Sequence, residues 1–390
     1  MRVEGDFIVI NKWLLPFSWL YGLGVKLRNF AFELGILKSR SFDVPVISVG
    51  NITVGGTGKT PHVEYLAKHL KELFHVAILS RGYKRKSKGF ILANAQTTML
   101  DIGDEPYQMK QKFPDVTVAV DKSRCHGIEE LVGNDKSLDV ILLDDAFQHR
   151  YVKPGINILL VDYHRLVIYD TLLPAGRLRE PLVAKDRADV VIVTKCPKDL
   201  KPMEFRVITK AMHLYPYQNL YFTTLEYDDM QPIFGGESRS LKSLKADEQI
   251  LLLTGIASPE QMVHDLEPYS KNLTPLTFAD HHHFKTKDIQ LINETFEKLP
   301  QPRCIITTEK DATRLHNVEG LSEEVRRHIY TLPVSIRFMQ EQEETFNQYI
   351  IGYVRKNSRN SILAKREDDH KPTDSYYSGD RPRTISFRNN

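Results

Sequence analysis

The chain has 390 residues, 41% of them hydrophobic and 26% charged, so it can bury a sizeable core, and wholesale disorder is excluded. Its three widely separated cysteines exclude a disulfide scaffold and a Cys-x-x-Cys metal cluster. The net charge is +3, and residues 355–390 alone contribute nine Lys/Arg against five Asp/Glu. The rest of the chain is therefore not basic, which argues against a dedicated nucleic-acid binder.

The N-terminal region contains thirteen consecutive uncharged residues, 13–25, which include both tryptophans of the chain. Lys12, Lys26 and Arg28 flank this stretch, as is typical of a helix lying in a membrane interface. A helix packed on its own domain is the alternative, and Pro16, Gly22 and Gly24 argue against one long regular helix. No run of 18 uncharged apolar residues exists, so we expect residues 1–37 to associate with a membrane without spanning it.

A glycine-rich loop follows the first apolar, β-branched segment, residues 44–50, which we expect to be a buried strand. Residues 61–73 then show helical spacing, so the order strand, loop, Gly-Lys-Thr, helix is that of a P-loop. Thr53 stands where the strict pattern has its first glycine, and an ordinary glycine-rich turn is the alternative. The expected phosphate-binding residues are Gly55, Gly56, Thr57, Gly58, Lys59 and Thr60.

A P-loop predicts an acidic residue at the end of a neighbouring buried strand. The apolar segment 139–143 leads into Asp144 and Asp145, a Walker-B-like arrangement that would hold Mg²⁺. Adjacent residues of an extended chain point to opposite sides, so we expect only one of the two carboxylates to face the metal.

Three further polar clusters follow expected strands. Five basic residues lie within 81–88, either as a solvated run or as an anion-binding loop. Asp104, in Gly-Asp-Glu-Pro, is either a helix cap or a functional carboxylate. Residues 281–283 are three consecutive histidines without metal-ligand spacing, so a proton-handling histidine is favoured over a zinc site.

The expected architecture is α/β: a P-loop NTPase-like, doubly wound parallel sheet in residues 38–225, with a second, smaller α/β domain in residues 249–356. Residues 226–248 are polar and contain Pro232, Gly235 and Gly236, so we interpret them as a linker. Residues 357–390 contain few apolar residues and are expected to be disordered. The expected strands are 44–50, 75–80, 116–121, 138–144, 156–162 and 188–195, then 249–255, 273–279 and 303–308.

Seven motifs follow one another along the chain: SVGNITVGGTGKTP (48–61), LSRGYKRKSKG (79–89), GDEP (103–106), LDDAFQHR (143–150), LLPAGRLREP (172–181), ADHHHF (279–284) and TTEKDATRL (307–315). Together and in this order they resemble the tetraacyldisaccharide 4'-kinase family, the lipid A 4'-kinases of Gram-negative bacteria. An unrelated P-loop protein would share only the first of them and the fourth.

The resemblance implies transfer of the γ-phosphoryl group of ATP to the 4'-hydroxyl of a tetraacylated glucosamine disaccharide 1-phosphate, which gives lipid IVA. It implies a peripheral enzyme at the cytoplasmic face of the inner membrane, with its active site between two α/β/α domains. We expect a monomer.

The resemblance also implies residue roles. Asp104 would be the base, with His281 as its partner, although His282 stays open as the alternative. Arg177 and Arg179 would stabilise phosphoryl charge. The expected metal environment consists of Thr60, Asp144, Asp145 and Glu180 around Mg²⁺.

Two other classes of protein compete with this interpretation. A nucleotide-dependent switch would need the P-loop but no acceptor site. A membrane-binding module would leave the P-loop unexplained. Guanine recognition is disfavoured, because Pro197 replaces the aspartate of an Asn-Lys-x-Asp motif.

Overall fold

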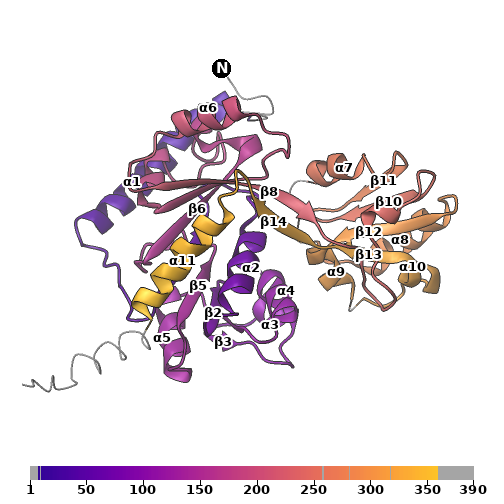
Figure 1. Cartoon of the computed structure of the whole chain (residues 1–390), viewed down its shortest axis with the longest axis horizontal. Coiled ribbons are helices and arrows are strands. Elements are labelled where there is room, and N and C mark those ends of the chain that lie inside the picture. Colours follow the sequence, from indigo (N-terminus) through magenta and orange to yellow (C-terminus); the bar gives the residue numbers. More distant parts are fainter. Residues whose placement is uncertain (1–7, 9, 257–258, 281, 317, 359–390) are drawn as a thin grey trace, which may run out of the picture.

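The computed structural model describes residues 8, 10–256, 259–280, 282–316 and 318–358, and these form two α/β units joined by two long strands (Figure 1). The larger unit is built on a nine-stranded sheet of order β14-β8-β7-β6-β1-β5-β2-β4-β3. All neighbouring pairs are parallel except at the two edges, where β14 and β3 run antiparallel to their neighbours. The strands are β1 (Val46–Gly50), β2 (Val76–Ser80), β3 (Ile91–Leu92), β4 (Thr117–Val120), β5 (Val140–Asp144), β6 (Ile156–Asp162), β7 (Val190–Thr194), β8 (Asn219–Tyr227) and β14 (Val334–Phe338).

Helices cover both faces of this sheet, as its fully buried central strands require. One face packs against α2 and α11, through side chains such as Leu66 and Phe346. The other face packs against α5 and α6 in two separate apolar clusters. The helices of this unit are α1 (Leu15–Glu33), α2 (Lys59–Leu70), α3 (Met99–Ile102), α4 (Asp104–Lys112), α5 (Arg124–Asn134), α6 (Pro202–Met212) and α11 (Glu343–Asn357), with short 3₁₀ turns η1 (Lys12–Leu14), η2 (Tyr163–Arg165), η3 (Val167–Tyr169) and η4 (Leu182–Arg187).

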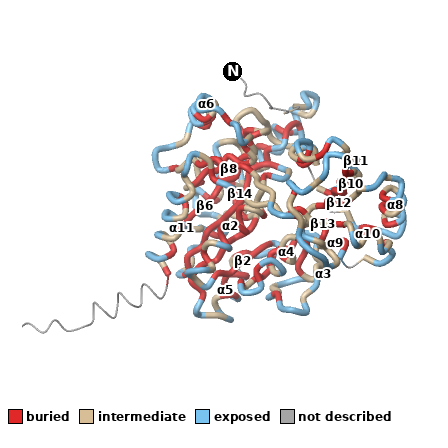
Figure 2. The backbone as a smooth tube through the Cα atoms, turned by 45° about the vertical axis from the view of Figure 1, so that its right-hand side comes forward, coloured by how far each residue is buried: buried red, intermediate tan, exposed pale blue. Residues whose placement is uncertain are grey.

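The smaller unit has a five-stranded sheet of order β11-β10-β12-β13-β9, parallel except for β9. Buried residues follow the strands of both sheets (Figure 2), so each unit has its own core. The elements of the smaller unit are β9 (Gln231–Pro232), η5 (Leu241–Ser243), β10 (Gln249–Thr254), α7 (Glu260–Leu266), β11 (Leu273–Thr277), α8 (Thr286–Glu297), β12 (Arg303–Thr308), α9 (Glu309–Leu315), α10 (Glu323–His328) and β13 (Ile329–Leu332).

The expected α/β class, with a doubly wound and mostly parallel larger sheet, is confirmed. The boundaries within the chain differ from the expected ones. Residues 334–356 fall in the range 249–356 assigned to the smaller domain, yet β14 pairs with β8 and α11 packs in the core of the larger unit. Residues 226–248 were interpreted as a linker, yet they supply β9, which pairs with β13. The chain thus crosses between the units twice, along β8 and back along β14 (Figure 1). The expected disordered tail lies outside the described residues, apart from Asn357 and Ser358.

The N-terminal helix α1 is a single 19-residue helix, so the expected interruption by Pro16, Gly22 and Gly24 was wrong. Pro16 lies in the first turn, where no helical N–H bond is lost. Gly22 faces the larger unit so closely that a Cβ atom there would lie 2.7 Å from Leu172 Cδ1. No helix among the described residues is long and apolar enough to cross a membrane.

Candidate active site

The glycine loop connects β1 to α2 at the carboxyl edge of the larger sheet, where ligands of such sheets bind. Gly58 precedes α2 with φ of +80°, a left-handed conformation that favours glycine. The Asn51 side chain donates to Thr57 Oγ1 at 2.8 Å and so ties the two ends of the loop together. The N-terminus of α2, with Lys59 and Thr60 in its first turn, therefore faces the space above the sheet edge.

A second segment braces the loop and accounts for Thr53 in place of glycine. Thr53 forms an antiparallel bridge with Leu178, and the Val54 N–H donates to the Arg177 carbonyl at 2.9 Å. The Arg179 N–H donates to the Ile52 carbonyl at 2.7 Å. Because residues 52–54 are extended and paired, a side chain is tolerated there. The pairing also brings the segment of Arg177 and Arg179 to the phosphate loop, although the two arginines lie about 120 positions away in the chain.

The two aspartates after β5 face different partners. Asp144 is fully buried and accepts a hydrogen bond from Ser80 Oγ at 3.0 Å. Asp145 adopts φ of +47°, which turns its carboxylate toward Lys59 Nζ at 3.5 Å and Arg179 Nη1 at 3.8 Å. Burial raises the pKa of Asp144 to about 7, with further increases from Glu105 and Asp145 and an opposing effect of Lys59.

Buried oxygens at this edge fit a divalent cation. Oδ1 of Asp144 and Oδ1 of Asp145 have no hydrogen-bond partner among the described residues, and Thr60 lies in the adjoining first turn of α2. A buried carboxylate oxygen without a hydrogen bond is costly unless a cation or water satisfies it, and Asp145 Oδ1 already has Lys59 Nζ at 3.5 Å. Within the described part of the chain no three His, Cys, Asp or Glu side chains form a metal site by themselves. Two carboxylates beside a phosphate loop suit Mg²⁺, which proteins hold with few carboxylates together with phosphate oxygens.

Glu180 has a different environment. It is buried, and its Oε2 pairs with Arg187 Nη2 at 2.5 Å, while Oε1 lies 3.9 Å from Arg28 of α1. Its Oε1 has no hydrogen-bond partner among the described residues. Tyr21 of α1 donates to the carbonyl of the adjacent Arg179 at 2.8 Å. The Glu180 segment therefore links the N-terminal helix to the phosphate loop.

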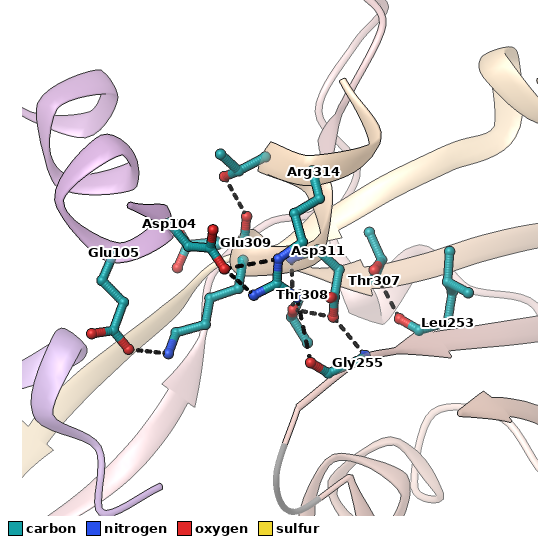
Figure 3. A network of polar contacts seen from close by, with 11 residues as sticks. Asp104, Glu105, Leu253, Gly255, Thr307, Thr308, Glu309, Asp311 and Arg314 are labelled. Carbon is teal, nitrogen blue, oxygen red and sulfur yellow. Dashed lines mark hydrogen bonds and ion pairs between the residues drawn. The ribbon is translucent and has the colours of Figure 1, made fainter. Parts of the chain in front are cut away.

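Asp104 begins α4 and meets the smaller unit (Figure 3). Gly103 before it has φ of +91°, and a Cβ atom there would lie 2.7 Å from the Tyr83 carbonyl oxygen, so only glycine fits. The Asp104 side chain is 10% exposed and its Oδ2 accepts from Arg314 Nε at 3.0 Å and from Arg314 Nη2 at 2.5 Å. Asp104 is therefore the first helical residue and not the N-cap of α4, which is Gly103, and its side chain forms a buried ion pair with Arg314 of α9.

The histidine cluster is only partly described. His281, the expected partner of Asp104, lies outside the described residues. His282 Nε2 lies 2.8 Å from Asp288 Oδ2 at the start of α8, and its ring stacks on Phe278. The described contacts of His282 are therefore with its own unit.

Sequence reasoning missed four basic side chains at the site. Buried Arg124 donates to the Asp144 carbonyl at 2.9 Å, and Lys195 donates to the Gly56 carbonyl. Arg165, the third, flanks Gly55 together with the expected Arg177, because their Nη1 atoms would lie 3.9 and 4.0 Å from a Cβ atom there. The fourth is Arg314. The available signal was position, because Arg124, Arg165 and Lys195 each follow a strand of the parallel sheet at its carboxyl edge.

A phosphate loop, a strand-end aspartate pair and converging lysine and arginine side chains define a P-loop phosphotransferase or NTPase. The family model of tetraacyldisaccharide-1-P 4'-kinase matches residues 10–354, and the chain belongs to this family.

Known proteins of the same kind resemble the chain over nearly its whole length. It is 60% identical over 363 residues to the tetraacyldisaccharide 4'-kinase of Phocaeicola vulgatus, covering 92% of this chain and 99% of that one. It is 56% identical to the enzyme of Bacteroides thetaiotaomicron, covering 95% of this chain and 100% of that one. Among solved structures, LpxK from Aquifex aeolicus in complex with ATP matches with a TM-score of 0.68 and 30% identity, covering 88% of this chain and 98% of that one.

Membership of this kinase family decides between the classes of protein that the sequence left open. The chain is a kinase that uses ATP to phosphorylate the tetraacyldisaccharide 1-phosphate precursor of lipid A on its 4'-hydroxyl, giving lipid IVA. The alternatives of a nucleotide-dependent switch and of a non-catalytic membrane module are excluded.

Proposed function

We propose that Asp104 is the general base of this kinase. The observation that supports it is a buried carboxylate at the start of α4, a helix that Gln108 and Lys112 tie to Glu64 of the P-loop helix α2, and that faces the smaller unit. The adjacent Glu105 acts electrostatically on Asp144, so α4 adjoins the Walker-B aspartate. A carboxylate there can accept the proton of the sugar hydroxyl as the new P–O bond forms. His281 would take part as its partner.

The remaining roles follow from where charge develops. Backbone N–H groups of residues 55–58 and the Lys59 ammonium would hold the triphosphate of ATP. Arg177 and Arg179 would stabilise charge on the transferred phosphoryl group. Thr60, Asp144 and Asp145 would hold Mg²⁺, with Glu180 shaping the surroundings. Support comes from Asp144 Oδ1, which is buried and has no hydrogen-bond partner among the described residues, and from Asp145 Oδ1, which is in the same situation except that Lys59 Nζ lies 3.5 Å away. Bound Mg²⁺ would neutralise phosphate charge during transfer.

We further propose that α1 binds the cytoplasmic face of the inner membrane, where a four-chain lipid substrate would be presented, and that the kinase acts as a monomer. Support comes from the outer face of α1, where Trp19 is 86% exposed beside exposed Leu20, Leu23 and Leu27. Exposed Lys12 and Lys26 suit anionic lipid headgroups. A contiguous exposed apolar face of this kind indicates an interaction surface.

The test of the base is Asp104→Asn, assayed as transfer of label from [γ-³²P]ATP to the tetraacyl disaccharide 1-phosphate. Turnover should fall by about two to four powers of ten, the typical contribution of a general base. ATP affinity, measured by calorimetry, should change little, because Asp104 does not belong to the phosphate loop. Asp101→Asn is the matched control, since Asp101 caps the neighbouring helix α3 from the surface.

The ion pair with Arg314 complicates Asp104→Asn, because breaking a buried pair can cost several kcal/mol of stability. Thermal unfolding of the variant should therefore be recorded beside the assay. Asp104→Glu keeps the charge and should retain more turnover than Asp104→Asn. Wild-type turnover in a folded Asp104→Asn protein would remove Asp104 from the reaction.

A further inference from the structure

Three ion pairs join α4 of the larger unit to α9 of the smaller one. They are Asp104 with Arg314, Glu105 with Lys310, and Lys112 with Glu309 (Figure 3 draws the first two). Lys112 also reaches Glu64 of α2 at 2.7 Å, one turn beyond the phosphate-binding Thr60. Ion pairs therefore connect the two units, and one of them involves Asp104, the proposed base.

Arg314 is fixed from the side of the smaller unit. Its side chain is 1% exposed, and its Nη1 donates to Asp311 Oδ1 at 2.8 Å. Asp311 is itself fixed, because its Oδ2 accepts from the Gly255 N–H at 2.8 Å and from Thr308 Oγ1 at 2.7 Å. Gly255 directly follows β10 and Thr308 ends β12, so the guanidinium is attached to the framework of the smaller sheet. A planar guanidinium held on one side presents its Nε and Nη2 hydrogens to Asp104 in one orientation.

The charged groups around Asp104 have both signs. On its own helix Glu105 follows it, on α9 Asp311 shares Arg314 with it and Glu309 pairs with Lys112, and Asp144 lies at the end of β5. The cations are Lys310 and Arg314 on α9, Lys112 on α4 and Lys59 on α2. Asp280, His282 and His283 lie in the loop after β11.

The pKa of Lys310 reflects the charged groups around Asp104. Burial lowers its pKa, but the carboxylates of Glu105, Asp280 and Asp144 outweigh burial, and the net pKa is raised. A buried carboxyl group among like charges tends to take up a proton, and an adjacent guanidinium opposes this.

We propose that Arg314 is a positioning residue for phosphoryl transfer, which keeps Asp104 ionised and aimed and makes the base competent only when α9 is docked on α4. This inference rests on the proposed role of Asp104. Arg314 touches neither nucleotide nor acceptor in this assignment and acts through Asp104 alone. The smaller unit thus supplies part of the base's environment across a separation of 210 residues.

The test is the pH profile of kcat for Arg314→Gln and Arg314→Lys. Without the guanidinium charge, Arg314→Gln should lose activity at neutral pH. The acid side of its profile should move upward by about one pH unit or more, because Asp104 takes up a proton more readily. KM for ATP should stay within a factor of about three, since the phosphate loop is untouched. Arg314→Lys retains the charge, so the acid side should return toward the wild-type position while kcat stays reduced.

A destabilised smaller unit could also lower kcat, and Arg239→Gln controls for this. Arg239 forms a bidentate pair with buried Glu248 at 2.6 Å for both contacts, within the smaller unit and away from α4. The Arg239→Gln variant should have a lower melting temperature but the same pH profile of kcat as the wild type. The proposal would be overturned if the acid side of the pH profile did not move in Arg314→Gln. It would also be overturned if the acid sides of the Arg314→Gln and Arg314→Lys profiles lay at the same pH.

The double variant separates this inference from the proposed function. If Asp104→Asn abolishes turnover and Arg314→Gln adds nothing to it, both stand, because the two residues act as one unit. Additive losses of turnover would exclude action of Arg314 through Asp104. They would overturn this inference and leave the proposed role of Asp104 in place. Unchanged turnover in Asp104→Asn would instead remove the base, and the inference with it.

Discussion

At the scale of single residues, Asp144 and Asp145 have different environments although they are neighbours in the chain. Asp144 is buried, with one oxygen bound by Ser80 and the other without a hydrogen-bond partner among the described residues. Asp145 is partly exposed and lies between Lys59 and Arg179. The left-handed backbone at Asp145 produces this division, because it redirects the second carboxylate toward α2. We therefore propose that Asp144 has the more direct part in metal binding.

Asp144→Asn should raise the Mg²⁺ concentration needed for half-maximal turnover by at least about tenfold, since a charged ligand is lost. In the wild-type protein a pKa of about 7 means that Mg²⁺ must displace a proton below neutrality. Apparent Mg²⁺ affinity should therefore fall by up to about tenfold per pH unit below 7. Mg²⁺ titrations of turnover at pH 6 and pH 8 measure both effects. Asp139→Asn, at the opposite end of β5, should leave the Mg²⁺ dependence unchanged.

At the scale of elements, α2 is held to the sheet by a buried histidine that the motif does not include. His62 Nδ1 lies 2.7 Å from the Gly58 carbonyl and Nε2 lies 3.1 Å from Thr223 Oγ1 of β8. A carbonyl oxygen only accepts, so Nδ1 bears the hydrogen and Nε2 accepts from the threonine. Burial lowers the pKa of His62 to about 4. The first turn of the phosphate-binding helix therefore depends on a neutral imidazole.

Acid should destabilise the protein through His62. Its folded pKa of about 4 lies below the ordinary value of 6.5, so the unfolded state binds the extra proton between these values. The stabilisation is complete above pH 6.5 and is lost as the pH falls toward 4. From this group we expect a loss of about 2 kcal/mol between pH 7.5 and pH 5.

Urea unfolding at the two pH values measures this loss, and His62→Gln should show a smaller difference between them. His69→Gln, one of the half-exposed positions of the same helix, is the control. An equal pH difference in wild type and His62→Gln would show that other groups dominate.

At the scale of the whole molecule, what the sequence predicted was local. The strand at 156–162, the P-loop and the strand-end aspartates each rest on patterns within about 15 residues, and the expected ranges agree closely with β6, β1 and β5. The return of β14 and α11 to the larger sheet could not be predicted, because pairing with β8 depends on residues more than 100 positions away. The same holds for Arg314, whose sequence context TTEKDATRL indicates a capped helix and nothing about its partner. Long-range pairing is set by packing and not by local propensity.

The proposed membrane contact of α1 would set how the whole molecule approaches its lipid substrate. Trp19, Leu23 and Leu27 are spaced by four and lie on one exposed stripe of α1, whereas Ser18, Gly22 and Asn29 face the protein. Replacing the three exposed residues by serine should weaken binding to anionic vesicles by about 3 kcal/mol, or roughly 100-fold, because their apolar area no longer leaves water. Sedimentation with phosphatidylglycerol vesicles measures this.

A double variant at Leu291 of α8, in the smaller unit, and Leu92 of the edge strand β3, which are also exposed, should bind vesicles as the wild type does. ATP affinity should be unchanged in both variants, since the stripe points away from the phosphate loop. The Tyr21 contact to the Arg179 carbonyl and the Arg28 contact to Glu180 are retained in the triple variant, so loss of vesicle binding would report on the stripe alone. Undiminished vesicle binding by the triple variant would mean that α1 is not the membrane contact, and its exposed face would then have to meet the acyl chains of the substrate or another protein.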